Sequence, residues 1–136
     1  MSDRPNRYAE RLRKAGLRPT RQRLALAQLL FASGDRHVTA ETLHDEAISA
    51  NVKVSLATVY NTMHQFTHAG MLREVTVDGS RIYFDTNTGE HHHFYCEDDA
   101  TLVDIAGNAV EVAGLPAPPH GAKIDRVDVI VRLKRR

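Results

Sequence analysis

Three consecutive histidines, His91-His92-His93, are the side chains of this 136-residue chain best suited to binding a metal ion. In an extended strand, residues two apart share a face, so His91 and His93 are expected on one face and His92 on the other. Two imidazoles need one or two further ligands, and mixed nitrogen and oxygen ligands suit Fe, Mn or Zn. Three residues outside the run have suitable side chains: His37, Asp85 and Asp104. A surface histidine cluster without metal is the competing interpretation.

The N-terminal segment indicates a second kind of chemistry. Its first 23 residues hold eight arginines or lysines and two acidic residues, although the whole chain has a formal net charge of only +1. A basic stretch of this kind neutralises phosphates and releases counterions, which favours nucleic-acid binding. A solvated helix face would give the same composition.

The elements that position these residues begin with four predicted helices, each bounded by cap or glycine signals. They run from Pro5 to about Ala15, from the cap Thr20 to before Gly34, after the cap Thr39 through Ile48, and from Leu56 to Ala69 after the cap Ser55. The inward residues expected in the second and third helices are Leu26, Leu29, Leu30, Leu43, Ala47 and Ile48.

The fourth helix has two distinct faces. Four apolar residues at helical spacing are expected to point inward: Leu56, Val59, Met63 and Phe66. The opposite face consists of Ala57, Thr58, Asn61, His64 and Gln65, with Tyr60 on its flank. This face has almost no charge and many hydrogen-bonding groups, which predicts close contact with a polar partner.

Two extended stretches follow, Leu72–Val77 and Arg81–Phe84, and Asp78-Gly79 between them is a strong hairpin signal. Helices followed by a hairpin in this order are typical of a winged helix-turn-helix. In that arrangement the fourth helix enters the major groove of DNA and the hairpin lies along the backbone.

The C-terminal part predicts a small β-rich domain. Thr86–Gly89 is turn-rich, and the expected strands are His93–Cys96, Leu102–Ile105, Val110–Val112 and Val127–Leu133. The exposed edges of so small a sheet predict pairing with a second copy of the chain. We therefore expect an α+β fold with a DNA-binding domain over 1–85, a hinge over 86–90, and a dimerisation and sensing domain over 91–136.

Composition excludes several classes of protein. A single cysteine, Cys96, excludes an intrachain disulfide and a zinc site built from CxxC pairs. No apolar run approaches the ~20 residues of a membrane helix. The N-terminus is charged and lacks the apolar core of a secretory signal. We expect a soluble cytoplasmic protein without a membrane partner.

Four sequence blocks resemble the ferric uptake regulator (Fur) family in its own order: Thr39–Leu43, Ser55–Tyr60, Ala69-Gly70 and His91–Cys96. Three further stretches resemble its iron response regulator (Irr) subgroup: Asn61–Thr67, Leu115–Pro119 and Arg126–Leu133. The resemblance covers nearly the whole chain.

The resemblance implies a regulator of iron or haem homeostasis, not an enzyme, that binds double-stranded DNA as a homodimer or higher oligomer. It implies one divalent metal site between the domains, at His37, Asp85, His93 and Asp104, with His91 adjacent. Occupancy of that site would set the reach of two reading helices on a palindromic, AT-rich operator. The residues expected to contact DNA are Arg18, Arg21, Arg23, Lys53, Thr58, Tyr60, Asn61 and Gln65.

The chain departs from the family pattern in ways that change these expectations. Cys96 has Asp99 where its CxxC partner would stand, so no structural zinc held by four cysteines is expected. Asn61 replaces an arginine that many members carry, and Asn pairs with adenine, which predicts a different operator. A second histidine-based site, of which His91, His92 and Glu111 are the remaining candidates, is expected to be weak or absent because Val127 replaces its last histidine.

Haem is a further hypothesis. The Cys-Pro haem motif of the subgroup is absent, since Glu97 follows Cys96, but the histidine cluster His91, His92 and His93 resembles its second haem element.

Two other functions compete with this one. With Fe(II), the same ligands would allow metal-catalysed oxidation of His37 or His91, as in a peroxide sensor, although the missing cysteine zinc site argues against it. A small metal-dependent hydrolase is the other, but the sequence offers neither an HExxH motif nor an evident nucleophile.

Overall fold

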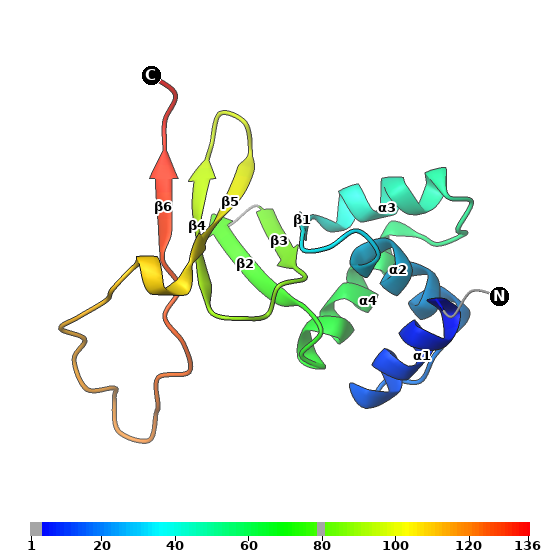
Figure 1. The fold of residues 1–136 in the computed structure, drawn as a ribbon, viewed down its shortest axis with the longest axis horizontal. Coiled ribbons are helices and arrows are strands. Elements are labelled where there is room, and N and C mark those ends of the chain that lie inside the picture. Colours follow the sequence, from blue (N-terminus) through cyan, green and yellow to red (C-terminus); the bar gives the residue numbers. More distant parts are fainter. Residues whose placement is uncertain (1–3, 79–80) are drawn as a thin grey trace. The chain divides into compact units, whose positions relative to one another are not determined.

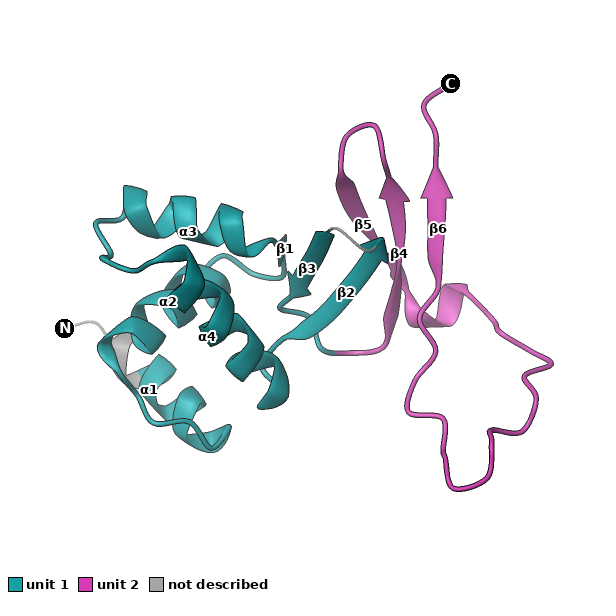
Figure 2. Ribbon diagram, turned by 180° about the vertical axis from the view of Figure 1, so that it is seen from behind, with its two compact units in different colours: residues 1–88 teal, residues 89–136 magenta. Residues whose placement is uncertain are grey.

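The computed structural model describes residues 4–78 and 81–136, and the chain divides into two compact units, 1–88 and 89–136 (Figures 1 and 2). In the described residues, the first unit contains helices α1 (Arg4–Lys14), α2 (Arg21–Phe31), α3 (Ala40–Ser49) and α4 (Leu56–His68) with a three-stranded sheet. The second unit contains another three-stranded sheet. The predicted α+β fold class is confirmed. No helix in the described ranges has the length and hydropathy to span a membrane.

The predicted helix caps are present in the structure. The side-chain oxygens of Thr20, Thr39 and Ser55 each accept a hydrogen bond from the backbone N–H three residues later. Such caps satisfy one of the amide groups that the first turn of a helix leaves without a partner. They explain why these helices begin where they do.

The core of the first unit is formed by the apolar faces of its helices and by Phe84 of the sheet. Its fully buried members include Leu12, Leu26, Leu30, Leu43, Val59, Met63, Phe66 and Phe84. Two residues predicted to point inward do not. Ile48 is 54% exposed, because it lies about 140° around α3 from Leu43, which faces the core. Leu56 is 41% exposed, because it opens α4 and helix side chains lean toward the N-terminus, beyond the core layer.

The sheet of the first unit has the order β1-β3-β2, with antiparallel pairing throughout. Strands β2 (Arg73–Asp78) and β3 (Arg81–Asp85) confirm the two predicted extended stretches. Of the predicted Asp78-Gly79 turn, Gly79 lies outside the described residues. The two-residue strand β1 (His37–Val38) was not predicted, because two residues are too few for a periodic pattern.

The second sheet has the order β5-β4-β6 and is built on β4 (His91–Cys96). Strand β5 (Thr101–Ala106) pairs with β4 antiparallel, and β6 (Ile130–Leu133) pairs with β4 in parallel. The strand predicted over Val110–Val112 is wrong. The chain forms a 3₁₀ turn over Gly107–Ala109 and continues as coil, and no strand among the described residues pairs with this segment.

The last strand also starts later than predicted. The backbone N–H of Val129 donates to His92 Nδ1 at 3.1 Å, so this donor is used by a side chain, and β6 begins one residue later at Ile130.

Candidate metal centre and DNA-reading helix

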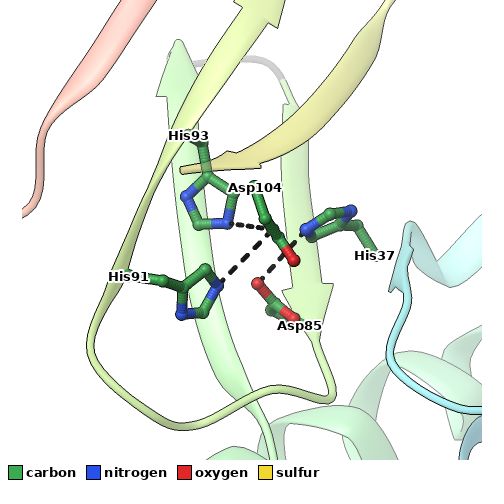
Figure 3. Close-up of side chains that lie close together, drawn as sticks. All are labelled: His37, Asp85, His91, His93 and Asp104. Carbon is green, nitrogen blue, oxygen red and sulfur yellow. Dashed lines mark ion pairs between the residues drawn. The ribbon is translucent and has the colours of Figure 1, made fainter. Parts of the chain in front are cut away.

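In the first unit, two side chains that can bind a metal, His37 and Asp85, lie next to each other. They are register partners of β1 and β3, and His37 Nε2 lies 3.3 Å from Asp85 Oδ2 (Figure 3). The Asp85 side chain is buried, and its Oδ1 accepts a hydrogen bond from the Asn87 N–H at 2.9 Å. A buried carboxylate is costly unless it is paired, so this position is built for a cationic partner or a metal.

The second unit carries a group of three: His91 and His93 in β4, and Asp104 in β5. His93 and Asp104 are register partners, and their Nε2 and Oδ1 atoms lie 3.3 Å apart. His91 Nε2 lies 3.6 Å from the same oxygen (Figure 3). The two imidazoles therefore share one face of the strand, as their spacing predicts, and both present Nε2 to one carboxylate.

A hydrogen bond fixes the tautomer of His91. Its Nδ1 lies 2.7 Å from the carbonyl oxygen of Gly89, and a carbonyl only accepts, so Nδ1 carries the proton. When the ring gives up its other proton to bind a metal, the lone pair is on Nε2, the atom that faces Asp104. This is the arrangement commonly found around metal-binding histidines, where the second nitrogen is held by a backbone or carboxylate acceptor.

His92 has a different role from its neighbours. Its Nδ1 accepts the hydrogen bond from Val129, so that nitrogen is unprotonated and is engaged in holding the chain ahead of β6. The predicted alternation of the three histidines along the strand is confirmed, with His92 separated by its contacts from His91 and His93.

The donor atoms in each unit fit a divalent transition metal. Each group offers imidazole nitrogen and carboxylate oxygen, the mixture that suits Fe, Mn and Zn. Within the second unit, the three ligand atoms lie within 4.8 Å of one another. The same limit holds for the pair in the first unit.

The outward face of α4 is polar, as predicted. Asn61 and Gln65 are exposed, while Thr58 is half-buried and its hydroxyl accepts a hydrogen bond from Ser55 Oγ at 3.0 Å. Tyr60 is 37% exposed, and its ring lies 4.7 Å from that of His64, which in turn packs edge-on against Phe84. The flank of the helix is thereby attached to β3.

The basic residues predicted to contact DNA do not all have the same surroundings. Arg18, Arg21 and Lys53 are exposed. Arg23 is half-buried, and its guanidinium donates to the Arg18 carbonyl at 2.9 Å and to Gln65 Oε1 at 3.0 Å. Sequence reasoning missed this link between α2 and α4, because a donor and an acceptor 42 residues apart carry no local signal.

Comparison with known proteins identifies the family. Residues 14–132 match the model of the ferric uptake regulator family. The chain belongs to this family. Its curated relatives include the ferric uptake regulation protein of Shigella flexneri, which is 32% identical over 83% of this chain and 78% of its own length. The transcriptional regulator FurA of Mycobacterium bovis is 34% identical over 90% of this chain and 84% of its own. The protein is therefore a DNA-binding transcription regulator of the Fur family.

Solved structures of Fur-family proteins share the fold. The ferric uptake regulator of Pseudomonas aeruginosa, solved with manganese, has a TM-score of 0.71 at 24% identity, covering 95% of this chain and 98% of that one. The regulator of Francisella tularensis, solved with iron, has a TM-score of 0.71 at 20% identity, covering 89% and 93%.

Proposed function

We propose that this Fur-family protein is a metal-responsive regulator of iron homeostasis in which both units contribute ligands to one divalent ion. His37 and Asp85 would bind it from the first unit, and His91, His93 and Asp104 from the second. The observation that carries the proposal is that each unit presents Nε2 and carboxylate oxygen within 3.3–3.6 Å of each other. Neither group alone supplies a full coordination shell.

The connecting segment limits how far apart the two groups can lie. Asp85 ends β3 and His91 begins β4, so only residues 86–90 separate them. A fully extended segment of that length spans at most ~20 Å. A short tether of this kind gives the second group a high effective concentration once the first has bound the ion.

Ligands from both units would restrict the angle between them, and this is how we propose that metal regulates the protein. Residues 1–85 would act as the reading domain, 86–90 as the hinge and 91–136 as the sensing and dimerisation domain. A ligand shifts a conformational equilibrium only if it binds one state better. Here that state is the one in which both groups reach the same ion.

The second sheet offers the surface through which we propose that two copies associate. Val103, Phe94 and Val131 are register partners across β5, β4 and β6, so they form a row on one face. All three are exposed, as is Leu133. A contiguous apolar row on a small sheet is typical of a protein contact, and a second copy would cover it with the same residues in two-fold symmetry.

A homodimer would present two copies of α4 to a palindromic operator, which we propose is AT-rich. Thr58, Tyr60, Asn61 and Gln65 are the candidates for base contacts in the major groove. The exposed residues Arg18, Arg21 and Lys53 are the candidates for phosphate contacts, and Arg23 adds its charge beside them.

We place the protein in the iron response subgroup on the sequence blocks at 61–67, 115–119 and 126–133. Haem at His91, His92 and His93 stays a prediction. The surroundings of these side chains favour a metal ion at His91 and His93, because their Nε2 atoms face the Asp104 carboxylate rather than an apolar surface. Peroxide sensing through oxidation of His37 or His91 also stays a prediction.

The decisive experiment is DNA binding measured by fluorescence anisotropy on duplexes from the DNA upstream of the protein's own gene. Mn²⁺, Fe²⁺, Zn²⁺ or haemin is added to metal-free protein. We expect a divalent ion to raise affinity about tenfold, within the usual range of coupling between two ligands. The double variant His93→Ala/Asp104→Asn should lose this response, and His68→Ala, an exposed histidine on α4, should keep it. An equal response of both variants would contradict the shared site.

A further inference from the structure

Arg23 is held by hydrogen bonds to three residues of the first unit. Its backbone N–H donates to the cap Thr20, and its Nη1 donates to the carbonyl of Arg18 at 2.9 Å. Its Nη2 donates to Gln65 Oε1 at 3.0 Å, which connects the start of α2 to the outward face of α4. The guanidinium is therefore also held by a contact that does not involve Gln65.

The chemistry of the pair fixes which way the Gln65 amide points. A guanidinium has donors and no acceptor, so the atom of Gln65 that meets it must be the carbonyl oxygen. A hydrogen bond from a charged donor is also roughly twice as strong as a neutral one. The amide NH₂ of Gln65 is then the group left to contact a partner on the exposed face of the helix.

A side chain that can only donate binds different bases from an amide that donates and accepts at the same time. Guanine presents O6 and N7, and thymine presents O4, all of them acceptors in the major groove. Glutamine pairs with adenine by donating to N7 while its oxygen accepts from the N6 amino group. In this protein that oxygen is directed at the Arg23 guanidinium, so the amide is not oriented to accept from the N6 amino group while it donates to N7.

We propose that Arg23 is a positioning residue that makes Gln65 a hydrogen-bond donor, so that Gln65 selects guanine or thymine over adenine in the operator. This inference rests on the proposed function, since it assumes that α4 enters the major groove. Asn61, one helical turn earlier on the same exposed face, carries no such contact to Arg23 and keeps the adenine preference expected from its type.

The test is selection of duplexes from a pool with randomised half-sites, in the presence of Mn²⁺, followed by sequencing. Gln65→Glu locates the base that position 65 reads, because a carboxylate accepts from cytosine N4 and should move the selected base there to cytosine. The wild-type protein should select guanine or thymine at that position, and the enriched base shows which of the two it is.

Arg23→Met then tests the positioning role, since methionine has similar length and no donor. We expect adenine to be enriched about tenfold at the position read by Gln65, within the range for one bidentate base contact. Arg21→Met is the matched control: it removes the same charge from an exposed position of the same helix and should weaken binding to all sequences alike. Thermal unfolding checks that each variant is folded.

Three results would overturn the inference. The first is adenine selected by the wild-type protein at the position that Gln65→Glu changes. The second is an Arg23→Met variant that loses affinity without changing the selected base there, as a plain phosphate contact would. Failure of the wild-type protein to enrich any duplex would overturn the proposed function and this inference with it, and that outcome is distinct from the other two.

Discussion

His37 and Asp85 face each other across β1 and β3, with His37 Nε2 3.3 Å from Asp85 Oδ2. His37 lies in the two-residue strand β1, between α2 and α3. The pairing of β1 with β3, which ends at Asp85, positions this candidate ligand. The two candidate metal ligands of the first unit therefore come from the edge strand β1 and from its neighbour β3.

Asp85→Asn should reduce metal affinity on the order of 100-fold or more. Outer-shell changes at metal sites already cost 10–100-fold, and here a buried carboxylate that we propose as a direct ligand loses its charge. The substitution preserves side-chain volume, and the asparagine oxygen can still accept from the Asn87 N–H. Calorimetric titration with Mn²⁺ measures the effect, with the exposed Asp45→Asn on α3 as control. An affinity within twofold of wild type would remove Asp85 from the ligand set.

We expect substitution of His92 to lower stability and substitution of His93 to remove the response to metal. His93→Ala should abolish the response to metal, whereas His92→Ala should keep it and lose about 1 kcal/mol of unfolding free energy, the usual worth of one hydrogen bond, because the Val129 N–H loses its acceptor. Denaturant unfolding and metal titration of both variants provide the comparison.

The same variants test whether haem binds. A Soret shift on adding haemin that vanishes in His92→Ala would place a haem ligand on the face opposite His91 and His93.

Local signals explain how far the sequence could predict this fold and site. The caps Thr20, Thr39 and Ser55 and the strand alternation of His91 and His93 depend on neighbours within four residues, and the structure confirms them. Strand β1 and the Arg23–Gln65 hydrogen bond join segments far apart in the chain, so no local pattern indicated them.

The wrong prediction that Ile48 is buried also arose because burial depends on packing between segments far apart in the chain. Ile48 is predicted to point inward together with Leu43 and Ala47, but the packed fold decides which stripe of a helix is buried, and Ile48 lies outside that stripe. The ligand set itself came from resemblance to the family, since spacing alone left His37, Asp85 and Asp104 as candidates by residue type.

Val103→Glu should convert the protein to a monomer. Val103 is 53% exposed at the edge of the row that it forms with Phe94 and Val131, and a charge there would be buried in each copy of a two-fold interface. Sedimentation velocity measures the oligomeric state. Val112→Glu is the matched control, because this valine is also exposed but lies outside the sheet. Dimers that survive Val103→Glu while Val112→Glu breaks them would place the interface on the coil after β5 instead.

Ser55→Ala should destabilise the start of the DNA-reading helix. Ser55 Oγ accepts from the Thr58 N–H at 3.1 Å and donates to the Thr58 hydroxyl at 3.0 Å, so one side chain caps α4 and orients a candidate base-contacting residue. Loss of an N-cap costs about 1 kcal/mol, and Ser55→Gly should cost only a few tenths. For a domain of this size, 1 kcal/mol lowers the melting temperature by ~4–8 °C.

Calorimetric melting of the two variants beside Ser49→Ala, an exposed serine at the end of α3, isolates the effect of the cap. DNA affinity should fall in Ser55→Ala, because the Thr58 hydroxyl loses the donor that orients it and the first turn of α4 loses its cap. A Ser55→Ala protein that melts and binds DNA like Ser49→Ala would show that packing of Val59, Met63 and Phe66 alone holds the first turn of α4 in place.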